Sequence, residues 1–304
     1  MRLSRRELFA AWAALAGSQA RSHSQAWRRK RNLPEARIFE IAATINGRIY
    51  CVTSGEDGKP GTEVYQYDPG ADNWTKKSRA NLIRHSFGAG VLEGRIYLWG
   101  GIAGGRMVHS TEVYDPASDQ WTTIGDFPRP RMFAKGAGVA GKLYAVGGIQ
   151  PPGRNQVPLM DEYDPKADRW TPKANMPVKR DAYRVAVARG KVYVVGNLGG
   201  SPQALEYDPA SDRWTVRASM PHPRFDFAIH SSGPLIYTFG GMGVATFEVY
   251  NAANDRWVTK LPMPQNNWEQ VAAEVNGRIY VIGDGFPAGS VLDVLWEYDP
   301  ALDR

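Results

Sequence analysis

The stretch GRIYLWGGIAGGRMVHSTEVYDPASDQW, from Gly94 to Trp121, holds the three markers that decide the fold. They are Gly-x-apolar-Tyr ending at Tyr97, Tyr-Asp-Pro starting at Tyr114, and the tryptophan itself. All three recur along the chain. The first marker has its tyrosine at Tyr50, Tyr97, Tyr144, Tyr193, Tyr237 and Tyr280; the second at Tyr67, Tyr114, Tyr163, Tyr207 and Tyr298, with a degenerate copy at Tyr250; the third lies at Trp74, Trp121, Trp170, Trp214 and Trp257.

The spacing of these markers is nearly constant. Seven residues separate each second-marker tyrosine from its tryptophan, and 23 residues separate each tryptophan from the next Gly-x-apolar-Tyr tyrosine. The interval from the first marker to the second varies from 13 to 19 residues, so the period is 43 to 49 residues. A fixed period of this length indicates a repeat architecture in which each unit is one small sheet.

Each unit has the pattern of four short strands. The first precedes the Gly turn, as in 87–92, and the second is apolar on successive residues, as in Ile96–Trp99, which is typical of a strand covered on both faces. The third ends at Tyr-Asp-Pro, where proline stops the ladder, and the fourth begins at the tryptophan. One such unit cannot bury both faces, whereas six arranged radially can. We therefore predict an all-β, six-bladed β-propeller over residues 27–304.

The last blade lacks its own fourth strand. Its tryptophan was due at position 305, but the sequence ends at Arg304. At the other end, Trp27 lies 23 residues before Tyr50, which is the spacing of a fourth-strand tryptophan. We therefore predict that the segment from Trp27 completes the last blade, so that the two ends of the chain pair and leave no free sheet edge at the seam.

These residues closely resemble the Kelch repeat, and the resemblance covers about 27–304. The Gly-Gly pairs at 100–101, 147–148 and 240–241 match the family, whereas Ser54-Gly55, Gly196-Asn197 and Gly283-Asp284 depart from it. The resemblance implies a propeller whose variable loops, between the second and third strands, lie on one face around a central channel. We expect the binding site on that face, walled by blades 1–3 and open toward blades 4 and 5, where these loops are shortest.

The loops that enter the first strands on this face supply the candidate site residues. An arginine stands ten residues after five of the tryptophans, and the residues that follow it differ between blades. Sixfold symmetry turns these arginines into a broken ring, in which unpaired guanidinium groups would bind carboxylates or phosphates and paired ones would serve the fold. The acids and aromatics beside them suit sugars or short peptides, although ordinary loop polarity also explains them. The predicted ligand-binding set is Arg37, Glu40, Arg84, Arg131, Arg180, Asp181, Tyr183, Arg224, Asp226, Trp268 and Glu269.

The residues give no recognisable catalytic set. There is no Gly-x-Ser-x-Gly motif, the adjacency of His85 and Ser86 does not define a triad, and Cys51 is the single cysteine. Galactose oxidase is a Kelch-type enzyme that uses copper, but its ligands find no matching positions among the scattered histidines of this chain. We therefore expect no metal and no cofactor, and the sequence identifies no catalytic residue.

The N-terminus has the pattern of an export signal. Arg5 and Arg6 precede a short apolar run, which resembles a twin-arginine signal and predicts a periplasmic or secreted protein; an amphipathic helix on a cytoplasmic protein is the alternative. We expect a signal peptide over 1–26, cleaved after Ala20 or Ala26, and no membrane span afterwards. The net charge of +6 comes from this end, since residues 1–31 carry +7 and the remainder −1, so nucleic acid is not an expected partner.

Two functions follow from these observations. The first is a monomeric binding or interaction protein that recognises an acidic glycan or small anionic sugar, a peptide or a partner protein at the channel mouth. The second is a cofactor-free sugar isomerase, because exported sialic acid mutarotases of bacteria are Kelch propellers. In that case Glu40, Asp181, Asp226 and Glu269 are the candidates for proton transfer, with arginines anchoring a carboxylate.

Overall fold

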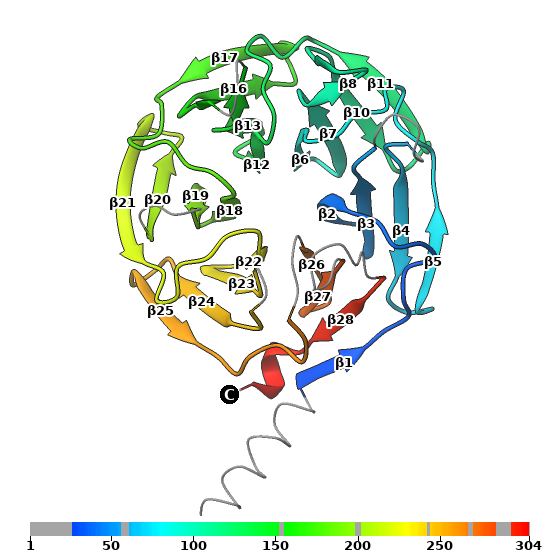
Figure 1. The fold of residues 1–304 in the computed structure, drawn as a ribbon, viewed down its shortest axis with the longest axis vertical. Coiled ribbons are helices and arrows are strands. Elements are labelled where there is room, and N and C mark those ends of the chain that lie inside the picture. The colour runs from blue at the N-terminus through cyan, green and yellow to red at the C-terminus, as the bar shows by residue number, and fades with distance from the viewer. Residues whose placement is uncertain are drawn as a thin grey trace, which may run out of the picture.

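A computed structural model describes residues 26–55, 61–151, 155–197, 202–241, 244–266, 270–283 and 293–303. Within them, six antiparallel sheets of four strands each stand around a central axis (Figure 1). This arrangement confirms the predicted six-bladed propeller. The signal sequence expected over 1–26 lies almost wholly outside the described residues. No helix among the residues described has the length and apolar character needed to cross a membrane.

Blades 1 to 5 run from innermost to outermost strand in chain order, and blade 6 takes its outermost strand from the N-terminal end of the described chain. Blade 1 holds β2 (Phe39–Ile45), β3 (Arg48–Thr53), β4 (Val64–Asp68) and β5 (Asn73–Lys76); blade 2 holds β6 (Gly88–Leu92), β7 (Arg95–Trp99), β10 (Thr111–Asp115) and β11 (Gln120–Ile124); blade 3 holds β12 (Lys135–Val139), β13 (Lys142–Val146), β16 (Met160–Asp164) and β17 (Arg169–Lys173). Two-stranded hairpins extend the loops of blades 2 and 3, with β8 (Ile102–Ala103) and β9 (Arg106–Met107) in one and β14 (Ile149–Gln150) and β15 (Asn155–Gln156) in the other.

The second half of the ring repeats the same order. Blade 4 holds β18 (Arg184–Ala188), β19 (Lys191–Val195), β20 (Gln203–Asp208) and β21 (Arg213–Ser219); blade 5 holds β22 (Ala228–Ser232), β23 (Leu235–Phe239), β24 (Phe247–Asn251) and β25 (Arg256–Thr259); blade 6 holds β26 (Val271–Val275), β27 (Arg278–Ile282), β28 (Leu295–Tyr298) and β1 (Trp27–Arg29). A short 3-10 helix, Pro300–Leu302, follows the last strand.

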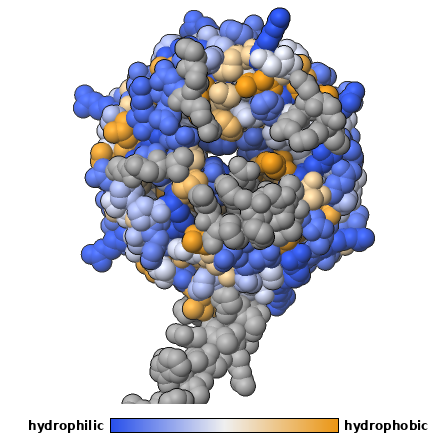
Figure 2. Space-filling view, viewed as in Figure 1, coloured by the Kyte–Doolittle hydropathy of each residue, from blue (hydrophilic) through white to orange (hydrophobic). Residues whose placement is uncertain are grey.

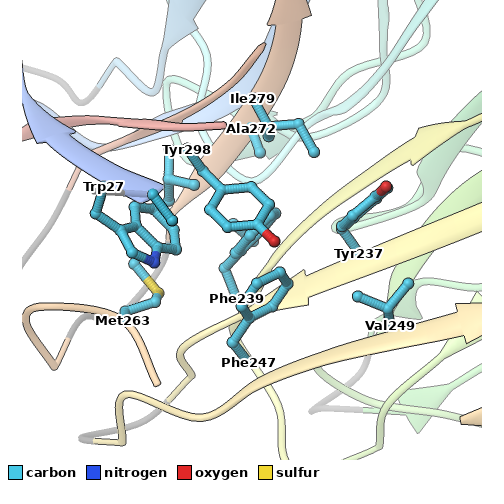
Figure 3. Close-up of a cluster of buried hydrophobic side chains, with 12 residues drawn as sticks. Trp27, Tyr237, Phe239, Phe247, Val249, Met263, Ala272, Ile279 and Tyr298 are labelled. Atoms are coloured by element: carbon cyan, nitrogen blue, oxygen red, sulfur yellow. The ribbon is translucent and has the colours of Figure 1, made fainter. Parts of the chain in front are cut away.

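The seam of the ring is closed as predicted, by pairing of the two ends of the chain. β1 pairs antiparallel with β28, and Trp27 stands opposite Tyr298. The two rings lie 4.8 Å apart at 41°, which matches the 4.9 Å and 41° of Tyr67 and Trp74 inside blade 1. Figure 3 shows Trp27 beside Tyr298 and above Phe239 and Phe247 of the neighbouring blade. Trp27 therefore takes the role of the missing fourth-strand tryptophan.

The repeated tyrosine, aspartate and tryptophan bind blades 1, 2, 4 and 5 to the blade before each of them. In blade 1 the Tyr67 hydroxyl donates to Asp72 Oδ1 at 2.5 Å, and that carboxylate also accepts the backbone N–H of Arg31 at 3.0 Å. The Trp74 indole donates to the Arg31 carbonyl at 3.1 Å. We call this set the Tyr-Asp-Trp clasp. Blades 2, 4 and 5 repeat it. There the backbone N–H and carbonyl belong to Ser78, Ala174 and Ala218, which lie at or just beyond the end of the preceding blade's outer strand.

Glycines bring the inner strands of blades 2 and 3 into backbone contact. A Cβ on Gly136 would lie 2.0 Å from the carbonyl oxygen of Ala89, and one on Gly88 would lie 2.1 Å from that of Ala134. The indole of Trp99 covers these glycines and donates to the Ala134 carbonyl at 3.1 Å. A side chain at either glycine has no space, so these positions fix the approach of β6 and β12 beside the channel.

This contact predicts that Gly136→Ala is strongly destabilising. The added methyl must displace the backbone of β6, and overpacking of this kind costs about 1–3 kcal/mol or more. The matched control is Gly70→Ala, where the nearest atom to a Cβ is 3.4 Å away and the change should stay below about 1 kcal/mol. Denaturant unfolding of both variants measures the difference, and equal stabilities would contradict the close contact.

Candidate functional site

A cavity of about 530 Å³ lies at the centre of the ring. Its walls come from the inner strands β2, β6, β12, β18, β22 and β26, so the cavity is the central channel. The space-filling view along this axis is open near the centre (Figure 2). At mid-depth the same strand position places small residues in five blades and a histidine in the other, namely Ala43, Gly90, Ala137, Ala186, Ala273 and His230. The channel is therefore an unfilled site of the size that small ligands occupy.

Charged side chains gather at one end of this cavity, where the loops enter the inner strands; we call this end the mouth. Lys135 and Arg184 are the first residues of β12 and β18. Lys135 Nζ lies 3.2 Å from Glu40 Oε2, and Arg184 Nη1 lies 3.4 Å from Asp226 Oδ1. The first pair joins blades 3 and 1 across the channel mouth. The mouth thus holds cations and carboxylates in contact.

A β-bulge aims Glu40 at the channel. Phe39 pairs with Thr53 and Ile41 with Val52, so Glu40 is an extra residue without a partner across the ladder. An extra residue of this kind turns its side chain out of the regular alternation, and bulges commonly re-aim side chains at sites. Blade 1 therefore contributes a carboxylate at the mouth because its strand departs from the repeat.

Asp181 and Tyr183 form side-chain hydrogen bonds where blade 4 meets the mouth. Residues in the left-handed region join two other pairs of blades, because the N–H of Phe133 donates to the carbonyl of Ser86 at 2.7 Å and that of Asp226 to the carbonyl of Ala182 at 3.4 Å. Between blades 3 and 4 the N–H of Ala182 instead donates to Asp181 Oδ1 at 2.8 Å. The Tyr183 hydroxyl donates to the Val146 carbonyl at 2.6 Å and lies 3.2 Å from the Phe133 carbonyl, and the side-chain amide of Gln156 donates to Asp181 Oδ2 at 3.2 Å. The Asp181 carboxylate is thereby fixed in orientation beside the cavity.

Four of the five ring arginines serve the fold. The guanidinium group of Arg84 lies 2.5 Å from Glu112 and that of Arg131 lies 2.7 Å from Asp161, in each case a carboxylate on the third strand of the arginine's own blade. Arg224 pairs in the same way with Glu248, and Arg37 contacts Glu35 at 2.8 Å and Glu63 at 3.3 Å. None of the four lines the channel cavity in the described chain. Removing a buried carboxylate partner would leave an uncompensated charge, so these side chains are held in place.

Arg180 differs from the other four because it lines the cavity. Its guanidinium donates to the carbonyls of Gly196 and Gln203 at 3.0 and 2.6 Å, and burial lowers its pKa to about 10. The repeat position that carries Glu112, Asp161 or Glu248 in other blades is Leu205 here. Of the predicted set, Glu40, Arg180, Asp181, Tyr183 and Asp226 therefore meet at the cavity.

Two predicted residues, Trp268 and Glu269, lie outside the described residues. The tips of five of the six loops between second and third strands also lie there, so the expected opening toward blades 4 and 5 stays a prediction. Sequence reasoning missed Lys135, Arg184, Gln270 and the pair His230 and Glu274, which all line the channel. Four of them lie within inner strands, and Gln270 immediately precedes β26. The signal that could have found them is a polar side chain at positions where most other blades carry small, aliphatic or aromatic residues.

His230 and Glu274 lie deeper in the channel, on adjacent blades. His230 Nε2 is 3.2 Å from Glu274 Oε2, and the hydrogen bond from His230 lowers the pKa of the Glu274 carboxyl. Both side chains are about one-fifth to one-quarter exposed, at 19% and 25%. They give the deeper channel a polar pair distinct from the charged mouth.

Comparisons with known proteins agree with this architecture. The family model described as "Kelch motif" matches residues 83–128 and 130–177, which contain blades 2 and 3. No curated protein matches the sequence. Among solved structures, one titled "Structure of YjhT" is similar with a TM-score of 0.74 and 15% sequence identity, over 88% of this chain and 95% of that one. At that identity the likeness concerns the fold. Together with the six four-stranded blades, these findings show an all-β, six-bladed propeller with Kelch repeats in blades 2 and 3.

Proposed function

We propose that this protein binds a small, acidic, hydroxylated ligand, such as an acidic sugar or the end of an acidic glycan, at the mouth of its channel. The observation that carries the proposal is the cavity of about 530 Å³ in which Lys135 and Arg184 stand beside three carboxylates. Pockets of about 300–1,000 Å³ suit small ligands, and a few converging polar groups give them specificity. We propose that this binding takes place in the periplasm or outside the cell, where the expected signal peptide would direct the protein.

The two ion pairs at the mouth can give way to a ligand. They are longer than the buried arginine pairs, at 3.2 and 3.4 Å, and their side chains are 10–20% exposed. These pairs keep some contact with solvent, so breaking them costs less than breaking the fully buried arginine pairs. A ligand carboxylate can therefore replace Glu40 or Asp226 as the partner of a cation, and it gains a charge-assisted hydrogen bond. The displaced carboxylates then become free to accept hydrogen bonds from ligand hydroxyls.

A peptide or partner protein fits the mouth less well. The charged groups lie within a ring of six inner strands rather than on an open face. Phe133, half-buried beside Lys135, adds an apolar surface on which a sugar ring can pack. The enclosed shape therefore favours a compact ligand.

Removing the cations should weaken binding of N-acetylneuraminate and D-galacturonate. We expect Lys135→Ala or Arg184→Ala to raise Kd by roughly 10-fold to 100-fold, because a hydrogen bond to a charged group contributes about 1.5–3 kcal/mol. The matched control is Arg95→Ala, which removes a cation from a surface pair with Asp115 far from the cavity and should leave Kd unchanged. Titration calorimetry at two salt concentrations measures this, and unchanged Kd in both mouth variants would refute the proposal.

A second candidate is a cofactor-free sugar isomerase or mutarotase. The observation that favours it is Asp181, whose carboxylate accepts two hydrogen bonds from uncharged donors and lines the cavity beside cations. Such a carboxylate can hold a proton transiently while a cation anchors the substrate.

This candidate predicts catalysis of anomer interconversion. NMR of N-acetylneuraminate should then show equilibration faster than in buffer, and Asp181→Asn should slow it by about 10²-fold or more, while binding persists. Asp164→Asn, which alters an exposed pair with Lys142, is the control. A rate equal to that of buffer would leave binding as the function for this sugar.

A further inference from the structure

Gln270 is the polar exception at an apolar position of the repeat. It immediately precedes inner strand β26, and the corresponding residues of the other blades are Phe39, Phe87, Ala134, Tyr183 and Phe227. All five of these side chains are buried and fill space at the blade seams. A repeat that keeps an apolar or aromatic side chain here for packing gains nothing for folding from an amide.

The amide of Gln270 is buried and has no partner in the part of the chain that the structure describes. The residue is 2% exposed, and neither Oε1 nor Nε2 has a hydrogen-bond partner among the described residues. Nearly all buried polar groups in folded proteins are hydrogen-bonded, so each exception calls for a missing partner. The same residue lines the channel cavity together with Arg180 and Asp226. The cavity is therefore where the missing partner belongs.

We propose that Gln270 binds hydroxyl groups of the channel ligand. Its amide offers an N–H donor beside a carbonyl acceptor, and a sugar hydroxyl or a vicinal pair of hydroxyls satisfies both. This inference rests on the proposed function, and it adds neutral recognition of hydroxyl groups to the charged recognition by Lys135 and Arg184.

Replacing Gln270 by an apolar residue distinguishes a role in ligand binding from a role in packing. An apolar residue of similar size removes both amide atoms, so the free protein loses nothing that was hydrogen-bonded. The ligand, in contrast, loses its partner. A binding residue of this kind lowers the stability of the free protein and increases its affinity for the ligand, whereas a residue that serves only the fold would not lower stability.

The test compares Gln270→Leu with the wild type. We expect the melting temperature of the free protein to stay the same or rise by about 2–4 °C, and Kd for D-galacturonate and N-acetylneuraminate to rise at least about 10-fold, as for loss of a paired polar contact. The dependence of Kd on salt should persist, because the amide carries no charge. Gln270→Phe, which restores the aromatic residue of three other blades, should behave alike.

Two results would overturn the inference. One is a Kd within twofold of wild type in both variants, and the other is a fall of more than about 4 °C in the melting temperature of both free variants, which would reveal a structural partner for the amide. Lys135→Ala keeps the two proposals distinguishable. If it weakens binding and Gln270→Leu does not, only the role of Gln270 fails; if the wild type binds neither sugar, the proposed function fails first.

Discussion

The Tyr-Asp-Trp clasp is the constraint on which the rest of the molecule depends. A four-stranded blade cannot bury both of its faces alone, and the ring exists only if each seam is held. At the seams of blades 1, 2, 4 and 5 a tyrosine-bound aspartate accepts a backbone N–H, and an indole donates to the carbonyl of the same residue in the preceding blade. The partners of the clasp in the preceding blade are a backbone N–H and a backbone carbonyl. The clasp therefore fixes the distance and tilt of neighbouring blades whatever side chains their inner strands carry.

Because the outer strands hold the blades together, the side chains of the inner strands can vary and serve binding. The channel is not filled by apolar side chains, and its walls differ from blade to blade. Glycines allow blades 2 and 3 to approach closely, a bulge in blade 1 turns Glu40 toward the channel, and Lys135 of blade 3 pairs with that carboxylate. The deviations from sixfold symmetry are concentrated around one cavity, as expected of a repeat that is regular where it folds and irregular where it binds.

The period of the markers was sufficient to predict the blades, their number and the closure by Trp27, since each marker has one structural task and recurs in fixed register. The site was predicted less completely. Periodicity placed Arg84, Arg131 and Arg224 near the axis, but their carboxylate partners on third strands are set by three-dimensional pairing that a one-dimensional spacing does not contain. Lys135 and Gln270 were missed because residues within or next to the inner strands were assigned to packing, and their burial and neighbours exist only in the folded ring.

Closure of the ring by the N-terminal strand is the claim that the channel and both proposals require. The most direct measurement is thermal unfolding of Trp27→Ala beside Trp74→Ala, two tryptophans of equal burial at 5% and 7% exposure. Each substitution should remove about 3–5 kcal/mol and lower the single melting transition by roughly 10 °C or more. A Trp27→Ala protein that melts within about 2 °C of wild type, while Trp74→Ala is destabilised, would contradict a ring closed by its two ends.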